Sequence, residues 1–163
     1  MLKIPMMPAV AIAFSIAMPI AAIEHPTPAI EQGTFKPSGP PDHPSRYEIG
    51  DICIVDLEQS YDVEGTLAGS MTIDFRIFVE GPCGAPPGTY EEHWIAHGHY
   101  HFENSRQTSG QGSLAYVAVV SAGGEVSGDL TFAGELEGDL KIDGRFQDGA
   151  MHYEGSIESN VKE

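Results

Sequence analysis

The sequence predicts an all-β protein, built as a seven- or eight-stranded antiparallel barrel, with a β-sandwich as the alternative. Three observations lead to this fold class. A long run near the C-terminus alternates apolar and polar residues, glycine-rich turns recur along the chain, and no segment has a convincing helical pattern. A barrel is favoured over a sandwich because closure leaves no sheet edge exposed.

The first 22 residues are expected to be a signal peptide, because Lys3 precedes an almost unbroken apolar run that ends near small residues at Ala22. The alternative is an N-terminal membrane anchor, since the run approaches the ~20 apolar residues that span a bilayer. Three prolines interrupt the run and favour cleavage. We therefore expect a secreted or periplasmic protein.

Residues 23–46 are expected to be a disordered spacer, because they contain six prolines and show neither helical nor strand periodicity. Folding would then begin near Tyr47, and residues 47–160 would form a single barrel domain with a modest core. Within that domain, Cys53 and Cys83 are the only cysteines of the chain. In an oxidising compartment they are expected to form a disulfide, with a pair of free thiols as the alternative.

The formal net charge is −16, from 8 basic and 24 acidic residues. Such a surface repels phosphate backbones and anionic lipid headgroups. We therefore expect no nucleic-acid partner and no binding to a membrane surface. The oligomeric state is left open by the sequence.

The strands expected first along the chain lie at residues 49–57, 71–79, 90–103 and 113–120. The second is the clearest, because its odd positions are apolar from Met71 to Val79. Gly123 and Gly124 then predict a hairpin turn.

From residue 125 to residue 146 every even position is apolar or glycine, which predicts β-strands with one buried face. A single strand of this length would not fit the domain, so a corner must interrupt it. The sequence at Gly128–Phe132 recurs at Gly138–Ile142, which places the corner between residues 134 and 138. The buried parity is kept, so a bend or an odd-length loop is expected there.

At Asp148-Gly149 the parity reverses, and this dipeptide favours a two-residue type I′ turn. Such a turn would place Tyr153 over a glycine on the neighbouring strand, which covers weak strand backbone. The pairs expected from this turn are Phe146 with Met151, Gly144 with Tyr153, and Leu140 with Ile157.

Several short motifs follow one another from residue 63 onward. They are Glu64-Gly65-Thr66-Leu67-Ala68-Gly69, Gly88-Thr89-Tyr90, Gly110-Gln111-Gly112-Ser113, the run from Gly134 to Leu140, Gly144-Arg145-Phe146 and Tyr153-Glu154-Gly155. In this order they resemble the allene-oxide-cyclase-like, lipocalin-like small barrels, including bacterial members of that superfamily. The resemblance implies an eight-stranded antiparallel barrel with an apolar cavity, which some relatives use to fold a flexible small molecule for cyclisation. No catalytic residue is carried over.

Four histidines, His93, His97, His99 and His101, share one face of the strand expected at residues 90–103, and aromatic residues share the other. The aromatic face is the more apolar, so we expect the imidazoles to point outward as a solvated, titratable face. The alternative is a zinc or copper site that uses His97 with His99, or His99 with His101, and a carboxylate from a neighbouring strand. If the faces were reversed, the histidines would line the barrel and a metal or acid–base role would be favoured.

The function expected first is the binding of a small apolar molecule, with a cyclase or isomerase that shapes its substrate as the enzymatic version. The residues expected to line the cavity are Trp94, Tyr100, Phe102, Phe132 and Tyr153. The alternatives are the metal-binding exported protein described above and a non-catalytic structural or envelope module. A filled barrel with an exposed apolar patch would indicate the last of these.

Overall fold

The computed structural model describes residues 30–103, 109–145 and 148–160. The expected signal peptide lies outside the described residues. Within the described ranges, no helix is long and apolar enough to span a membrane.

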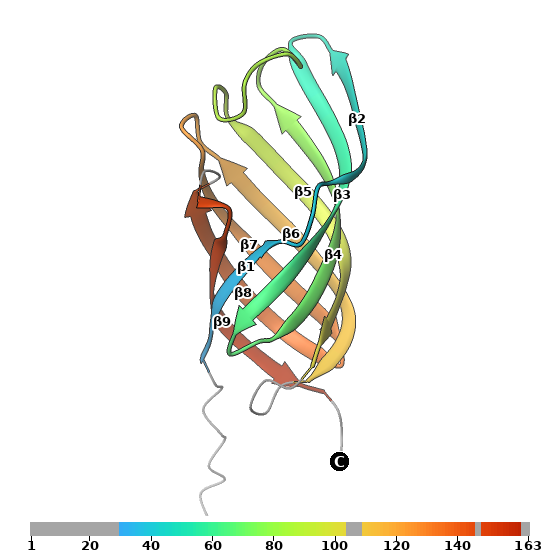
Figure 1. The fold of residues 1–163 in the computed structure, drawn as a ribbon, viewed down its shortest axis with the longest axis vertical. Helices are drawn as coiled ribbons and strands as arrows, with labels where there is room; N and C mark the ends of the chain where they lie inside the picture. Colours follow the sequence, from blue (N-terminus) through green and yellow to red (C-terminus); the bar gives the residue numbers. More distant parts are fainter. Residues whose placement is uncertain (1–29, 104–108, 146–147, 161–163) are drawn as a thin grey trace, which may run out of the picture.

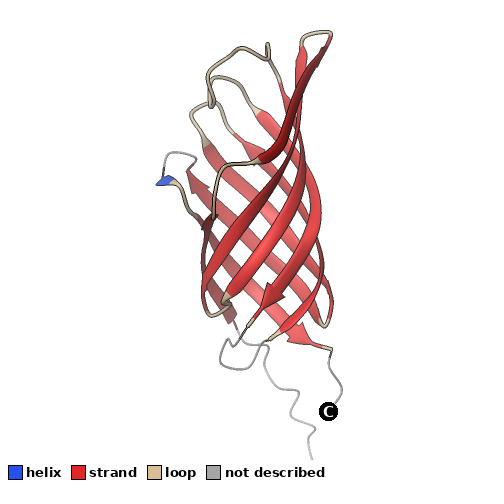
Figure 2. Cartoon of the chain, turned by 45° about the vertical axis from the view of Figure 1, so that its right-hand side comes forward, coloured by secondary structure: helices blue, strands red, loops and turns tan. Residues whose placement is uncertain are grey.

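Strands make up almost all of the regular structure, as Figure 2 shows. In chain order they are β1 (Ile30–Pro37), β2 (Asp42–Ile49), β3 (Ile52–Gly65), β4 (Gly69–Val79), β5 (Glu92–Phe102), β6 (Gly110–Val120), β7 (Glu125–Gly134), β8 (Leu136–Arg145) and β9 (Met151–Ser159). All pairings are antiparallel, in the order β1-β9-β8-β7-β6-β5-β4-β3, and β1 also pairs with β3. The chain is therefore a closed eight-stranded antiparallel barrel with one further strand, β2, outside it (Figure 1).

The expected spacer is wrong for residues 30–46, because this segment supplies β1 and most of β2. β1 closes the barrel by pairing with β9 on one side and with the end of β3 on the other. β2 then continues along the same edge of β3 and, within the described residues, pairs with no other strand. Its Pro44 falls where the register shifts between Asp42 and Ser45, and an edge strand tolerates proline at such a bulge.

The interior is lined by the alternate residues of each strand, as the period-two pattern predicts. On β5 the even positions, including Trp94 and Tyr100, are buried, while His97, His99 and His101 are exposed. The expected orientation of this strand is therefore confirmed. The same alternation continues across β6, β7 and β8.

The corner expected between residues 134 and 138 is confirmed as a tight turn between β7 and β8. Leu130 pairs with Leu140 and Phe132 with Gly138, so the two sequence repeats lie side by side in antiparallel register. The turn at Gly123 and Gly124 is also present, between β6 and β7, and both glycines have positive φ. Only glycine adopts such a conformation without strain.

The register expected for the last hairpin is wrong by two residues. Gly144 pairs with Met151, Ile142 with Tyr153, and Gly138 with Ile157. The connection is longer than a two-residue type I′ turn, and its Gly149 has a positive φ. In the observed register Leu140 faces Gly155 and Ile157 faces Gly138, so each large side chain lies opposite a glycine. A narrow barrel interior favours such large–small pairs.

Tyr153 does lie over a cross-strand glycine, but the glycine is Gly33 of β1 rather than Gly144. A β-carbon at Gly33 would come within 2.5 Å of the Tyr153 hydroxyl. Tyr100 lies over Gly112 of β6 in the same way, at 2.7 Å. Tyr153 thereby reaches the β3–β4 turn and Tyr100 the β7–β8 turn, both at the same end of the barrel.

The end that carries the β3–β4 and β7–β8 turns is closed by two leucines, and we name it the closed end. Leu67 and Leu136 point inward from these turns and are fully buried. The Tyr153 hydroxyl accepts the Leu67 N–H at 2.9 Å, and the Tyr100 hydroxyl accepts the Leu136 N–H at 2.9 Å. Leu67 and Leu136, each hydrogen-bonded through its N–H to a tyrosine, therefore fill the interior at this end in equivalent ways.

The opposite end, which we name the open end, carries the expected disulfide. Cys53, near the start of β3, is bonded to Cys83 in the β4–β5 connection, with a Cα–Cα distance of 4.8 Å. Glu48 of β2 also accepts the Cys83 N–H at 2.9 Å. The long β4–β5 connection is thus fastened to the part of β3 that extends past the barrel.

Candidate functional site

An apolar cavity of about 230 Å³ lies at the open end, where the barrel wall is incomplete. The pairing of β1 with β9 ends at Phe35 and Met151, and beyond that point β2 pairs only with β3. The cavity is partly open to solvent in this region. Its lining is Pro37, Pro41, Leu57, Gln59, Tyr61, Phe75, Ile77, Trp94, Gly149, Ala150 and Met151.

Aromatic rings form the deep wall of this cavity. Phe75 makes edge-on contacts with Tyr61 at 6.3 Å and with Trp94 at 5.5 Å between ring centroids. The Trp94 indole N–H donates to the buried carboxylate of Glu92 at 2.9 Å. Because its polar atom is occupied in this way, Trp94 presents an apolar ring to the cavity.

Gln59 contributes a polar side-chain amide to the cavity lining and also holds the neighbouring segment between β1 and β2 in place. Its side-chain N–H group donates to the carbonyls of Gly39 at 3.0 Å and Ser60 at 2.8 Å. The first bond fixes the segment between β1 and β2, which carries the lining residue Pro41 and follows the lining residue Pro37 at the end of β1. With its nitrogen occupied, the amide of Gln59 has its carbonyl oxygen left to accept a ligand donor.

Two tyrosine hydroxyls lie in the apolar region around the aromatic wall. Burial raises the pKa of Tyr61 and of Tyr116 well above the ordinary value of 10.0. The Tyr116 ring contacts Phe75 at 5.9 Å and Trp94 at 6.3 Å. Its buried hydroxyl has no hydrogen-bond partner among the described residues. Both phenols stay neutral at ordinary pH and provide neutral donors rather than acid–base groups.

Of the five residues expected to line a cavity, the structure places one at it. Trp94 is part of the cavity wall, whereas Tyr100, Phe102 and Phe132 pack together near the closed end. Tyr153 is also buried there, against the turn that carries Leu67. These four residues belong to the packed core of the barrel.

The main residues that the sequence reasoning missed are Gln59, Tyr61 and the proline segment that follows β1. Tyr61 occupies an odd, inward position of β3, but the expected first strand stopped at residue 57. The prolines at positions 37 and 41 were assigned to a spacer. A signal for Tyr61 did exist, because Gln59, Tyr61 and Val63 extend the odd-position pattern of β3 past residue 57.

The outward histidines of β5 are not gathered into one site. His97 lies 3.9 Å from Asp74 of β4, and His101 lies 3.0 Å from Glu103. None of His97, His99 and His101 belongs to a group of three possible metal ligands among the described residues. The zinc or copper site expected from these three residues stays a prediction.

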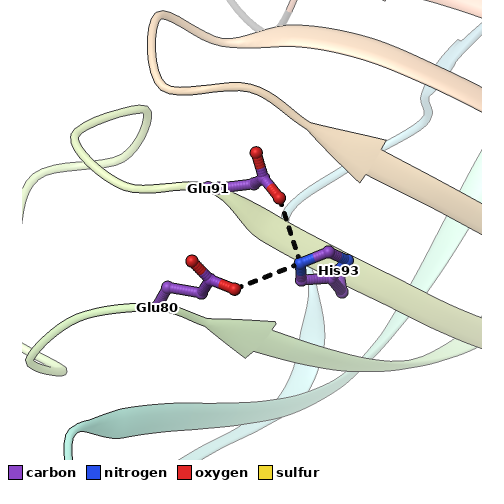
Figure 3. A group of neighbouring side chains, drawn as sticks. All are labelled: Glu80, Glu91 and His93. Carbon is purple, nitrogen blue, oxygen red and sulfur yellow. Dashed lines mark ion pairs between the residues drawn. The ribbon is translucent and has the colours of Figure 1, made fainter.

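His93, at the open end of the same strand, does lie in such a group. Its Nε2 atom is 3.5 Å from a carboxylate oxygen of Glu80 and 3.2 Å from one of Glu91 (Figure 3). One possible ligand atom from each residue lies within 4.8 Å of the others. Glu80 follows β4 and Glu91 precedes β5, so the group spans both ends of the disulfide-linked connection.

The fold and the cavity define the class of protein as a small, closed antiparallel barrel with an apolar pocket at one end. No protein-family model matches the chain. A search of curated proteins likewise finds no significant match.

Proposed function

We propose that this protein binds a small apolar molecule in the cavity at the open end of the barrel. The observation that carries the proposal is the apolar cavity of about 230 Å³, walled by Tyr61, Phe75 and Trp94, beside the buried apolar core of the described residues. Binding sites for small molecules are commonly concave and apolar with few polar groups, and the mouths of barrels are frequent locations. The cavity has each of these properties.

The dimensions and chemistry of the cavity indicate the ligand class. An engineered cavity of 150 Å³ binds benzene, so this one suits a molecule of roughly nine or ten non-hydrogen atoms. The carbonyl oxygen of Gln59 favours a ligand with one hydrogen-bond donor. For such a ligand we expect a Kd on the order of 100 μM, which corresponds to about 0.5 kcal/mol per atom.

Trp94 allows a direct test, because it is the only tryptophan of the chain and lines the cavity. 4-Propylphenol serves as the probe, since it has ten non-hydrogen atoms and one hydroxyl donor. Its titration should change the Trp94 emission with saturation, and calorimetry should give the same Kd. An emission that does not saturate would contradict the proposal.

A pair of variants gives the matched control. Ala150→Phe adds a ring at the cavity lining and should weaken binding at least tenfold, whereas Ala133→Phe adds the same ring to an exposed position of β7. The second variant should bind like the wild type. Equal affinities for the two variants would place the probe elsewhere.

The resemblance to allene-oxide-cyclase-like barrels supports the same proposal, because some of those proteins shape a small molecule in an apolar barrel cavity. A cyclase or isomerase function would be the enzymatic form, acting through substrate shaping. The Cys53–Cys83 disulfide supports an exported protein, since disulfides persist in oxidising compartments. The secreted or periplasmic location is part of the proposal.

A further inference from the structure

We propose that Glu80, Glu91 and His93 form a binding site for a divalent transition-metal ion such as Zn²⁺. The site lies on the outer face of the barrel at the open end and is separate from the ligand cavity. The residues provide one imidazole nitrogen and two carboxylates, with ligand atoms within 4.8 Å of one another (Figure 3). These are ligand types and a number of ligands that zinc accepts in proteins.

The backbone holds the two residues that carry the carboxylates next to each other. The N–H of Glu80 donates to the carbonyl of Glu91 at 3.0 Å, which clamps the two ends of the β4–β5 connection together. His93 is held on β5 by its pairing with Phe78 of β4. All three ligands therefore come from strand ends rather than from the tip of a loop, and little ordering is needed when an ion binds.

Charge gives an independent reason for a cation here. Two carboxylates lie close together, and in the described part of the chain their ion pairs are with His93 alone. Like charges at such a distance repel each other. A divalent ion would remove this repulsion, and the net charge of −16 would raise its local concentration.

The imidazole decides the class of metal. Ca²⁺ and Mg²⁺ prefer sites made of oxygen ligands, whereas imidazole suits zinc and other transition metals. Three protein ligands leave one tetrahedral position for water. The exposure of all three side chains gives the ion free access from solvent.

The inference is tested by calorimetric titration of ZnCl₂ into the untagged protein at neutral pH. The wild type should bind one ion per chain at this site. His93→Ala and Glu91→Gln should each lower the affinity at least about tenfold, as loss of a metal-site contact does. An excess of Ca²⁺ or Mg²⁺ should not displace the zinc.

His97→Ala is the matched control, because His97 lies on the same face of β5 and has one carboxylate at 3.9 Å. It should leave the zinc affinity unchanged. The inference is overturned if the wild type takes up no zinc, or if His93→Ala and Glu91→Gln bind like the wild type. It is also overturned if His97→Ala, His99→Ala or His101→Ala abolishes binding, which would place the ion on the histidine face further along β5.

Discussion

Two buried tyrosines are expected to respond in opposite ways to loss of the hydroxyl group. In Tyr153→Phe, the N–H of Leu67 loses the oxygen that accepts its hydrogen bond at 2.9 Å. Leu67 is fully buried, so no water replaces this partner. An unsatisfied buried donor costs about 1–3 kcal/mol, and we expect that loss of unfolding free energy.

Tyr116→Phe is the matched comparison, because it removes the same atom from another buried tyrosine; Tyr116 is 1% exposed and Tyr153 is 3% exposed. The Tyr116 hydroxyl has no partner among the described residues, so its removal leaves no group unsatisfied. Burial of a hydroxyl without a hydrogen bond is itself unfavourable by about 1–3 kcal/mol. We therefore expect this variant to be as stable as the wild type or more stable.

Urea denaturation followed by circular dichroism measures both variants. With a slope of about 1–3 kcal/mol per molar urea, Tyr153→Phe should lower the midpoint by roughly 1 M. Tyr100→Phe should behave like Tyr153→Phe, since its hydroxyl accepts the Leu136 N–H at 2.9 Å. If Tyr116→Phe were as destabilised as Tyr153→Phe, the reasoning from hydrogen-bond partners would be refuted.

Two further predictions concern the disulfide and alkaline pH. The double variant Cys53→Ser/Cys83→Ser should lose about 3–4 kcal/mol of unfolding free energy, because the disulfide closes a loop with a sequence separation of 30. A urea midpoint equal to that of the wild type would contradict this prediction. Burial raises the pKa of Tyr61, Tyr100, Tyr116 and Tyr153 above 10.0. The contribution of these tyrosines to stability should therefore be constant below about pH 10 and be lost above it, where the unfolded chain ionises first. Thermal unfolding at increasing pH measures this loss, and an unfolding temperature unaffected above pH 10 would argue against it.

The sequence predicted those strands that bury one apolar face. In β5 and in the β7–β8 hairpin, inward and outward residues differ strongly in polarity, so the period-two pattern gave both strand and orientation. β1 escaped detection because its inward positions are Glu31, Gly33 and Phe35, which do not read as an apolar face. Position 33 requires glycine because the Tyr153 ring lies across it, and this contact between β1 and β9 is visible only in the folded structure.

The candidate site was harder to predict than the fold. A single strand shows which residues share a face, and this placed Trp94 inside and the histidines outside. It does not show which neighbours a strand will have, so Tyr61 and the proline segment were missed at the cavity. In the same way, His93 was grouped with the other histidines of its strand, whereas its closest carboxylates come from the strand ends at Glu80 and Glu91.

The position of β1 has a consequence for synthesis of the chain. Ile30 pairs with Ser156, so β1 gains its second neighbour only when β9, the last strand, is present. A ribosome delivers the N-terminal strand first, and until β9 emerges the sheet retains two unpaired edges. Such edges can join strands of other chains. Successful folding of this protein therefore depends on β1 remaining free to pair until β9 has been synthesised.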